Sequence, residues 1–442
     1  MKPIPLFLGA IAIAAAATAF AEGDIDLRVS PERDKVFRTD NAEAILDISL
    51  IGRDVISERK CPLNLALVID HSGSMSEDHK IEHAREAARI AIDHLQPTDT
   101  FSLVEFDDRV KVLVPAQPVG DKDELKQIVN RIEPGGSTAL YSGVQEGAHQ
   151  LRKYFDEKNV NRIVLVSDGI ANVGPSSPSE MVSLGRSIRN NGGSVSTVGL
   201  GLDYNEDVMA SIAEASGANY YYVRDAEKLP DVIAQELGQV KDVLAQNLHI
   251  IIEVPEGVDP IEVVGMPEVK FEGRKATVTL GAFYGSQHRD ILVRCKIKSP
   301  QGDSAELAHA QIVYNAAGSG KELQADGVAH VHFTAQQADS DKSVNKSVAA
   351  EFALTRNAVT RKAALEMQDR GKFKEAAHLL KAQAQADAAA APALGNAKLA
   401  EEAKSLGGMA DQLDSEKAMS NGQRKDFQYE NYNQANQKAQ QQ

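Results

Sequence analysis

The stretch from Leu63 to Ser74 reads LNLALVIDHSGS, and it decides the fold. Its first part, from Leu63 to Asp70, is a nearly continuous apolar run, as expected for a β-strand buried on both faces. The residues that follow place apolar side chains on one helical stripe: Ile81, Ala84, Ala88, Ala91, Ile92 and Leu95. A buried strand followed by an amphipathic helix predicts one unit of a parallel sheet that is covered by helices on both faces.

The same alternation of strands and helices continues as far as Gln246. Further strands are predicted at Thr100–Phe106, Val110–Val114, Arg162–Val166, Val195–Leu200 and Asn219–Val223, with helical patterns between most of them. Residues 61–246 are therefore predicted to form an α/β domain with a mostly parallel, Rossmann-like sheet.

Segments with period-2 alternation lie on both sides of this domain. Before it, Ile25, Leu27 and Val29 alternate with polar residues, and Ala44, Leu46, Ile48 and Leu50 do the same. After it, five strands are predicted between Leu248 and Phe333, which suggests a β-sandwich over residues 247–340. The early segment, residues 22–60, is too small to bury its own face. We therefore expect it to join the sandwich, which makes the α/β domain an insertion.

The last hundred residues change character. Residues 341–418 are predicted to be helical, with a helical hairpin whose two helices flank Gly371. Residues 419–442 are rich in Gln and Asn, with few apolar side chains to bury, so a disordered tail is expected.

The first 21 residues fit a secretory signal peptide. Lys2 precedes an apolar stretch from Ile4 to Phe20, and Ala19-Phe20-Ala21 fits the cleavage pattern. An exported protein, periplasmic or secreted, is expected, and an uncleaved anchor is the alternative. No other run is long and apolar enough to predict a stable membrane span. Cys61 and Cys295 could pair in an oxidising compartment or remain two separate thiols.

Bulk composition excludes some functions. The chain has 43% hydrophobic and 25% charged residues, which is ordinary globular composition. Its formal net charge is −15 and it contains no basic run. Nucleic-acid binding is not expected, because such binding depends on neutralising phosphates.

Polar residues cluster where the predicted strands end. Asp70, Ser72 and Ser74 follow the first strand, Thr138 lies in a Gly-Gly-Ser-Thr loop, and Asp168 follows another buried strand. Ligands of open α/β sheets bind beyond the carboxyl ends of the strands. All five side chains offer oxygen, which Mg²⁺, Mn²⁺ and Ca²⁺ prefer. The sequence therefore predicts a divalent metal site.

These residues resemble the metal-ion-dependent adhesion site of the von Willebrand factor type A family, whose pattern is Asp-x-Ser-x-Ser, then Thr, then Asp. The resemblance covers roughly Cys61 to Gln246. It implies that the three hydroxyls bind the metal, that the two carboxylates act directly or through water, and that an open position accepts a carboxylate of a partner. The rim of the site is expected to contain His71, Met75, Tyr141, Ile170 and Asn172.

The function expected is therefore non-enzymatic binding of a protein or peptide that presents Asp or Glu. The sequence has no Gly-x-Ser-x-Gly elbow, no His-Glu-x-x-His motif and no phosphate-binding loop. The alternative is a scaffold or envelope assembly protein that acts mainly through its sandwich and helical regions. His309, His330 and His332 could hold a second metal, although the solvated face of a strand explains them more simply.

Overall fold

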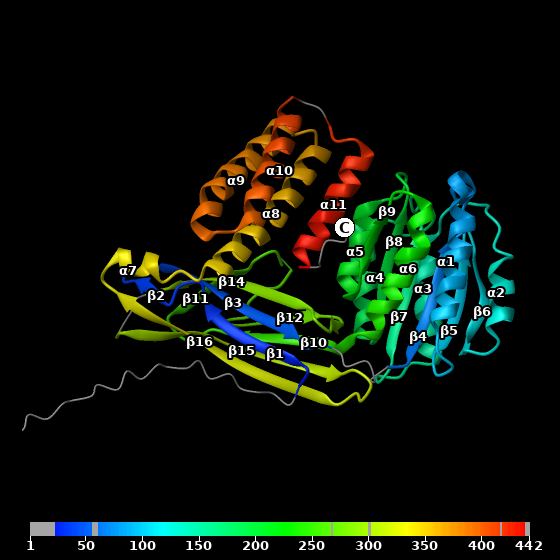
Figure 1. The fold of residues 1–442 in the computed structure, drawn as a ribbon, viewed down its shortest axis with the longest axis horizontal. Helices are drawn as coiled ribbons and strands as arrows, with labels where there is room; N and C mark the ends of the chain where they lie inside the picture. The colour runs from blue at the N-terminus through cyan, green and yellow to red at the C-terminus, as the bar shows by residue number, and fades with distance from the viewer. Residues whose placement is uncertain (1–22, 55–60, 267, 299–301, 416–417, 438–442) are drawn as a thin grey trace, which may run out of the picture.

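The computed structural model describes residues 23–54, 61–266, 268–298, 302–415 and 418–437, so the predicted signal peptide, residues 1–21, lies outside the described residues. The chain forms three parts (Figure 1): an α/β domain at one end, a β-sandwich at the other, and a helical region above the sandwich. Within the described ranges no helix has the length and apolar character needed to cross a membrane.

The α/β domain is built on a six-stranded sheet with the order β6-β5-β4-β7-β8-β9, in which only β6 is antiparallel to its neighbour. Its strands are β4 (Leu63–Asp70), β5 (Thr100–Phe106), β6 (Val110–Pro118), β7 (Val160–Ser167), β8 (Ser194–Leu200) and β9 (Tyr220–Val223). Its helices are α1 (Lys80–His94), α2 (Lys122–Val129), α3 (Leu140–Lys153), α4 (Pro178–Asn190), α5 (Glu206–Ser216) and α6 (Leu229–Lys241), with short 3-10 helices η1 (Gly73–His79) and η2 (Ala226–Lys228).

Strand β4 is buried on both faces, as its apolar run predicts. Leu65 and Leu67 join the core that contains residues of α1, α2 and α6. Ala66 and Val68 join the opposite core, which contains residues of α3, α4 and α5. Burial on both faces leaves the end of β4, at Asp70, as the point where polar groups can gather.

The sandwich consists of two sheets around one apolar core. One sheet has the order β1-β3-β14-β11, with β1 (Ile25–Pro31), β3 (Ala42–Gly52), β14 (His288–Ile297) and β11 (Val258–Val263). The other has the order β12-β10-β15-β16-β2, and β13 also pairs with β10; the bounds are β12 (Lys275–Leu280), β10 (Val243–Glu253), β15 (Ser304–Ala316), β16 (Glu322–Thr334), β2 (Lys35–Phe37) and β13 (Phe283–Tyr284). The prediction that the early β segment belongs to the sandwich is confirmed, since β3 pairs with β14 over ten residues on each strand.

Cys295 contributes to the sandwich core as a free, buried thiol, and burial raises its pKa to about 12. Cys61 instead packs against the core of the α/β domain. The structure therefore leaves Cys295 unpaired, and the two sulfurs belong to different cores.

The helical region contains the predicted hairpin, α8 (Lys346–Asp369) and α9 (Phe373–Leu394), preceded by the short α7 (Gln337–Lys342) and followed by α10 (Ala397–Asp414). The prediction of a disordered tail from residue 419 is wrong over its described part, because α11 spans Asn421–Ala435. This polar helix begins with a capping box formed by Ser420 and Gln423. Tertiary contacts stabilise this helix, since Tyr429 and Tyr432 both pack edge-on against Tyr220 of β9.

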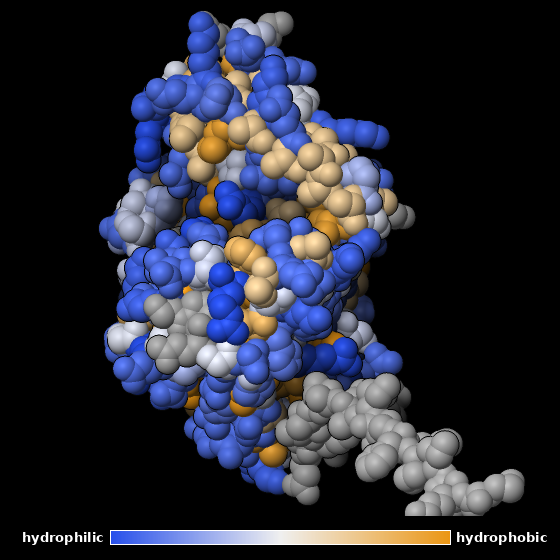
Figure 2. Space-filling model, turned by 90° about the vertical axis from the view of Figure 1, so that its left-hand side faces the viewer, coloured by the Kyte–Doolittle hydropathy of each residue, from blue (hydrophilic) through white to orange (hydrophobic). Residues whose placement is uncertain are grey.

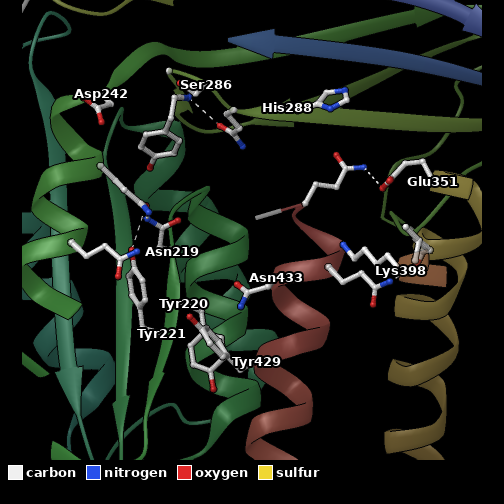
Figure 3. A pocket seen from close by; sticks show the side chains of 18 residues that line it. Asn219, Tyr220, Tyr221, Asp242, Ser286, His288, Glu351, Lys398, Tyr429 and Asn433 are labelled. Atoms are coloured by element: carbon white, nitrogen blue, oxygen red, sulfur yellow. Dashed lines mark hydrogen bonds between the residues drawn. The ribbon is translucent and has the colours of Figure 1, made fainter. Parts of the chain in front are cut away.

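The described part of the chain also contains a cavity and a groove. A cavity of about 550 Å³ opens where β9 and α6, the loop before β14, and helices α8, α10 and α11 meet (Figure 3). A groove of about 560 Å³ at the turn between α9 and α10 is lined mainly by alanines. Figure 2 shows that apolar residues gather on the helical region at the end of the molecule opposite the α/β domain.

Candidate metal centre

The structure brings the five predicted oxygen donors to one edge of the sheet. Asp70 is the last residue of β4, and Asp168 directly follows β7. Ser72 caps η1, Ser74 lies inside it, and Thr138 stands just before α3. Asp70 and Asp168 are fully buried, and Ser72 and Thr138 are nearly so.

Three of the donors form a chain of short contacts. Ser72 Oγ lies 3.2 Å from Ser74 Oγ. Ser74 Oγ in turn donates a hydrogen bond of 2.7 Å to Asp168 Oδ1. The loop after β4 is thus joined directly to the loop after β7, although their residues are far apart in the sequence.

The other two donors meet beside Gly169. A Cβ atom added to Gly169 would lie 2.7 Å from Thr138 Oγ1 and 3.3 Å from Asp70 Oδ2. The 2.7 Å distance is too short for a side chain at this position, so glycine leaves the space beside the two donors open.

Backbone hydrogen bonds fix the loops against one another. Gly73 N donates to Gly136 O at 3.1 Å, which joins the loop after β4 to the loop before α3. Thr138 O accepts from Asn172 N at 3.2 Å, and Thr138 N donates to Asn172 Oδ1 at 2.9 Å. These two hydrogen bonds join the loop before α3 to the loop after β7. The three loops therefore behave as one preorganised unit rather than as separate turns.

Asp70 is the most deeply embedded donor. Its Oδ1 accepts from Ser72 N at 2.8 Å, and its Oδ2 accepts from Ser167 Oγ at 2.5 Å. Burial raises the pKa of Asp70 to about 6, the hydrogen bonds from Ser167 and Ser72 oppose this effect, and the charge of Asp168 adds to it. A nearby cation would favour the ionised form of this carboxyl.

Two residues of the centre were not predicted from the sequence. One is Ser167, which holds Asp70. The other is Lys80, the first residue of α1, whose Nζ lies 2.7 Å from Asp168 Oδ2. A signal for it was present, since Lys80 stands four residues before Ala84 and eight before Ala88, on the stripe that faces the core.

The donor set fits a hard divalent cation. Within the described ranges, no group of three or more His, Cys, Asp or Glu side chains is arranged to hold a metal ion. The predicted donors offer a cation two carboxylates and three neutral hydroxyls, which suits Mg²⁺ or Mn²⁺ when water completes the shell. Metal binding by these five residues stays a prediction.

The expected rim is only partly present. Ile170 is 59% exposed next to Asp168, and Tyr141 is half-buried. Met75 is fully buried in the domain core, so its predicted place on the rim is wrong. His71 directs Nδ1 to the Glu133 carbonyl oxygen at 2.8 Å.

The three histidines considered for a second metal, His309, His330 and His332, lie on the sandwich and not in the α/β domain. His330 and His332 are exposed on β16, and His309 is partly exposed on β15. Their exposure is that of the solvated face of a half-buried strand.

Comparison with known proteins identifies the α/β domain. Residues 64–235 match the model of the von Willebrand factor type A domain. The fold also resembles a solved structure described as von Willebrand factor type A from Catenulispora acidiphila, with a TM-score of 0.67, 16% identity, and coverage of 90% of this chain and 97% of that one. The chain therefore contains a von Willebrand factor type A domain, and the similarity of fold extends over the sandwich and the helical region as well.

Two relatives share moderate sequence identity with the chain. The uncharacterized protein YfbK of Escherichia coli is 27% identical over 235 residues, which are 53% of this chain and 40% of that protein. The uncharacterized protein sll0103 of Synechocystis is 27% identical over 286 residues, which are 62% of this chain and 67% of that protein. The match thus spans less than half of the Escherichia coli protein.

Proposed function

We propose that this protein is an exported binding module, which holds a divalent cation on Asp70, Ser72, Ser74, Thr138 and Asp168 and uses it to bind an acidic group of a partner protein. Domains of this family mediate protein–protein interactions. The observation that carries the metal-dependent part is the convergence of five oxygen donors from three loops that are hydrogen-bonded into one unit.

The charge of the donor set favours an acidic ligand. Three of the five donors are neutral, so a divalent cation would keep much of its positive character. The partly exposed Ser74 and the exposed Ile170 mark the side from which a ligand would approach. An Asp or Glu side chain would supply a further oxygen there, with apolar contact to Ile170.

A binding role also fits the chemistry of Ser72 better than a hydrolytic role. Its hydroxyl contacts the Ser74 hydroxyl, and the adjacent imidazole of His71 is directed to the Glu133 carbonyl oxygen. A nucleophilic serine needs a base within hydrogen-bonding reach. We therefore propose that the protein is not an enzyme.

Thermal unfolding in EDTA and in millimolar MgCl₂ tests the proposal. The wild type should unfold at a higher temperature with magnesium, since occupancy at about 100 times the dissociation constant stabilises by about 2.7 kcal/mol. Asp70→Asn keeps the shape of the side chain but removes its charge, so the magnesium shift should disappear. A partner retained by immobilised wild type in magnesium should then be released by EDTA. An equal shift for wild type and Asp70→Asn would contradict the proposed site.

A second candidate is assembly through the sandwich and helical regions. The alanine-lined groove at the α9–α10 turn favours it. In that case partner capture would survive Asp70→Asn and would be lost on Ala400→Glu, which places a charge in the groove.

A further inference from the structure

Lys80 contacts the candidate metal centre from its buried side. Lys80 Nζ lies 2.7 Å from Asp168 Oδ2, and the side chains of Lys80 and Asp168 are 5% and 0% exposed. The other oxygen of this carboxylate, Oδ1, accepts the hydrogen bond of Ser74. One carboxylate therefore faces the proposed cation site through one oxygen and a fixed ammonium through the other.

The backbone before Lys80 is strained. Asp78 has φ 50° and His79 has φ 55°, so two successive residues with side chains occupy the left-handed region. Residues with a side chain are unfavourable in this region, because the Cβ atom lies too close to the backbone carbonyl oxygen. Both side chains are exposed, so their own burial does not offset the cost. The turn ends directly at Lys80, the first residue of α1, whose side chain is buried.

The position of Lys80 within its helix is also unfavourable. A cation at a helix N-terminus opposes the helix dipole. Burial of an ammonium adds a large desolvation cost. The ion pair with Asp168 offsets these costs. A buried ammonium at a helix N-terminus, paired with one carboxylate, is typical of a residue whose charge serves a functional site.

A count of formal charges shows what the ammonium changes. With both carboxyls ionised, Asp70 and Asp168 contribute two negative charges, and Lys80 leaves one of them uncompensated. A divalent cation would then give the centre one net positive charge. Without Lys80, the same centre would be neutral when loaded and doubly negative when empty.

We propose that Lys80 is a resident counter-cation of the metal centre, which stabilises the metal-free state and opposes metal binding. The inference rests on the proposed metal site and deepens it. Lys80 keeps the two carboxylates from repelling each other when no metal is bound. In the loaded state it leaves a positive charge for the acidic group of a partner to neutralise. Metal and partner would then bind cooperatively, because each is held more firmly when the other is present.

The decisive variant is Lys80→Met, which keeps the length of the side chain and removes its charge. In EDTA its unfolding temperature should fall by about 6 °C or more, because a buried carboxylate loses its partner. In calorimetric titration with MnCl₂ its affinity should rise on the order of tenfold or more, because a positive charge near the cation is gone. A lysine with a purely structural role would lower both quantities, so the opposite signs are the signature of a counter-cation.

The matched control is Lys425→Met. Lys425 Nζ lies 2.6 Å from Glu206 Oε2, and both side chains are about as buried as those of the Lys80–Asp168 pair, with 3% and 8% exposed. This variant should also lower the unfolding temperature in EDTA, but it should leave the affinity for Mn²⁺ unchanged. In the double variant Lys80→Met/Asp168→Asn, most of the stability lost in EDTA should return, since no unpaired charge remains.

The outcomes separate the two proposals. If the wild type binds no Mn²⁺, the proposed function fails and this inference fails with it. If the wild type binds Mn²⁺ and Lys80→Met binds it equally or more weakly, only the inference is overturned. A Lys80→Met protein that stays unfolded in saturating Mn²⁺ would overturn it too, since the cation should replace the missing charge.

Discussion

At the scale of single residues, Gly136 controls the position of the Thr138 loop. Its φ is +75°, and a Cβ atom there would lie 2.5 Å from Asp107 Oδ2. Gly136→Ala should therefore combine backbone strain with a steric clash and destabilise the domain by about 2–3 kcal/mol. Because the shifted loop carries Thr138, the magnesium-dependent increase in unfolding temperature should shrink as well. Urea unfolding with and without magnesium measures both effects.

Gly174→Ala is the matched control for this change. Gly174 has φ +80°, but a Cβ atom there would meet nothing within 4 Å. It should show the backbone cost alone, of about 1 kcal/mol, and keep the full effect of magnesium. Equal losses for the two variants would mean that the contact with Asp107 is unimportant.

Residue types at strand ends made the donor set predictable, whereas the only sequence signal for Lys80 was its position on the apolar stripe of α1. The carboxyl ends of parallel strands meet at one edge, so Asp70 and Asp168 could be placed together from the sequence. The position on that stripe indicates that Lys80 faces inward but not that it reaches Asp168, because nothing in its neighbours predicts a left-handed turn at Asp78 and His79. Met75 was misplaced for the same reason, since the path of η1 decides which side chains of this loop turn inward.

At the scale of elements, α8 packs on the sandwich sheet that contains β3 and β14, through an apolar patch and a group of carboxyls. Val348 of α8 joins Val264 and Leu292 of the sandwich in a small core. Burial raises the pKa of Asp47, on β3, to about 8, and the charges of Asp290 and Glu351 add to this effect. A pKa of about 8 predicts that Asp47 holds its proton in the folded protein at neutral pH.

This shift predicts how stability depends on pH. The folded-state pKa lies above the ordinary value of 3.8, so the native state binds the proton more tightly than the unfolded state does. The contribution of Asp47 to stability is complete below about pH 4 and is lost as the pH rises through about 8, at up to about 1.4 kcal/mol per pH unit. Asp47→Asn should remove this loss, so its unfolding temperature relative to the wild type should increase from pH 5.5 to pH 8.5.

The wild-type curve alone would not isolate this effect, because other groups titrate in the same range. The difference between Asp47→Asn and wild type is therefore the quantity to measure, with Asp341→Asn as an exposed control on α7. A difference that stays constant across this pH range would show that Asp47 is not protonated in the folded state.

Element prediction succeeded where apolar periodicity was present and failed where it was absent. The alternation around Leu46 and Ile48 correctly predicted β3, because one face of that strand supplies the sandwich core. The segment of α11 has little apolar periodicity, so composition favoured disorder. Its helix depends on contacts with distant residues such as Tyr220, and local sequence does not encode those contacts.

At the scale of the whole molecule, α11 connects the helical region to the α/β domain (Figure 1). Its Tyr432 hydroxyl donates to the Ala218 carbonyl oxygen, and Lys425 Nζ donates to Tyr204 O just before α5. Gly201, in the same loop as Tyr204, lies beside the end of the Lys80 side chain. The C-terminal helix therefore contacts the loop between β8 and α5, and these contacts join the helical region to the α/β domain.

Arg424 links α11 to both α5 and α8. Its guanidinium contacts Glu206 and Asp207 at the start of α5 and lies 2.8 Å from Asp369 at the end of α8, with 18% of its side chain exposed. Arg424→Leu would leave three carboxylates facing one another and should destabilise the docked arrangement by about 2–4 kcal/mol. Added salt should reduce this loss, because screening weakens the repulsion of the partly exposed charges.

Arg370→Leu, which removes an exposed arginine paired with Glu366 at 3.7 Å, should change stability by less than about 0.5 kcal/mol. Small-angle scattering and urea unfolding test this: Arg424→Leu should expand the molecule at low salt, and unchanged dimensions and stability would show that the aromatic contacts of α11 suffice.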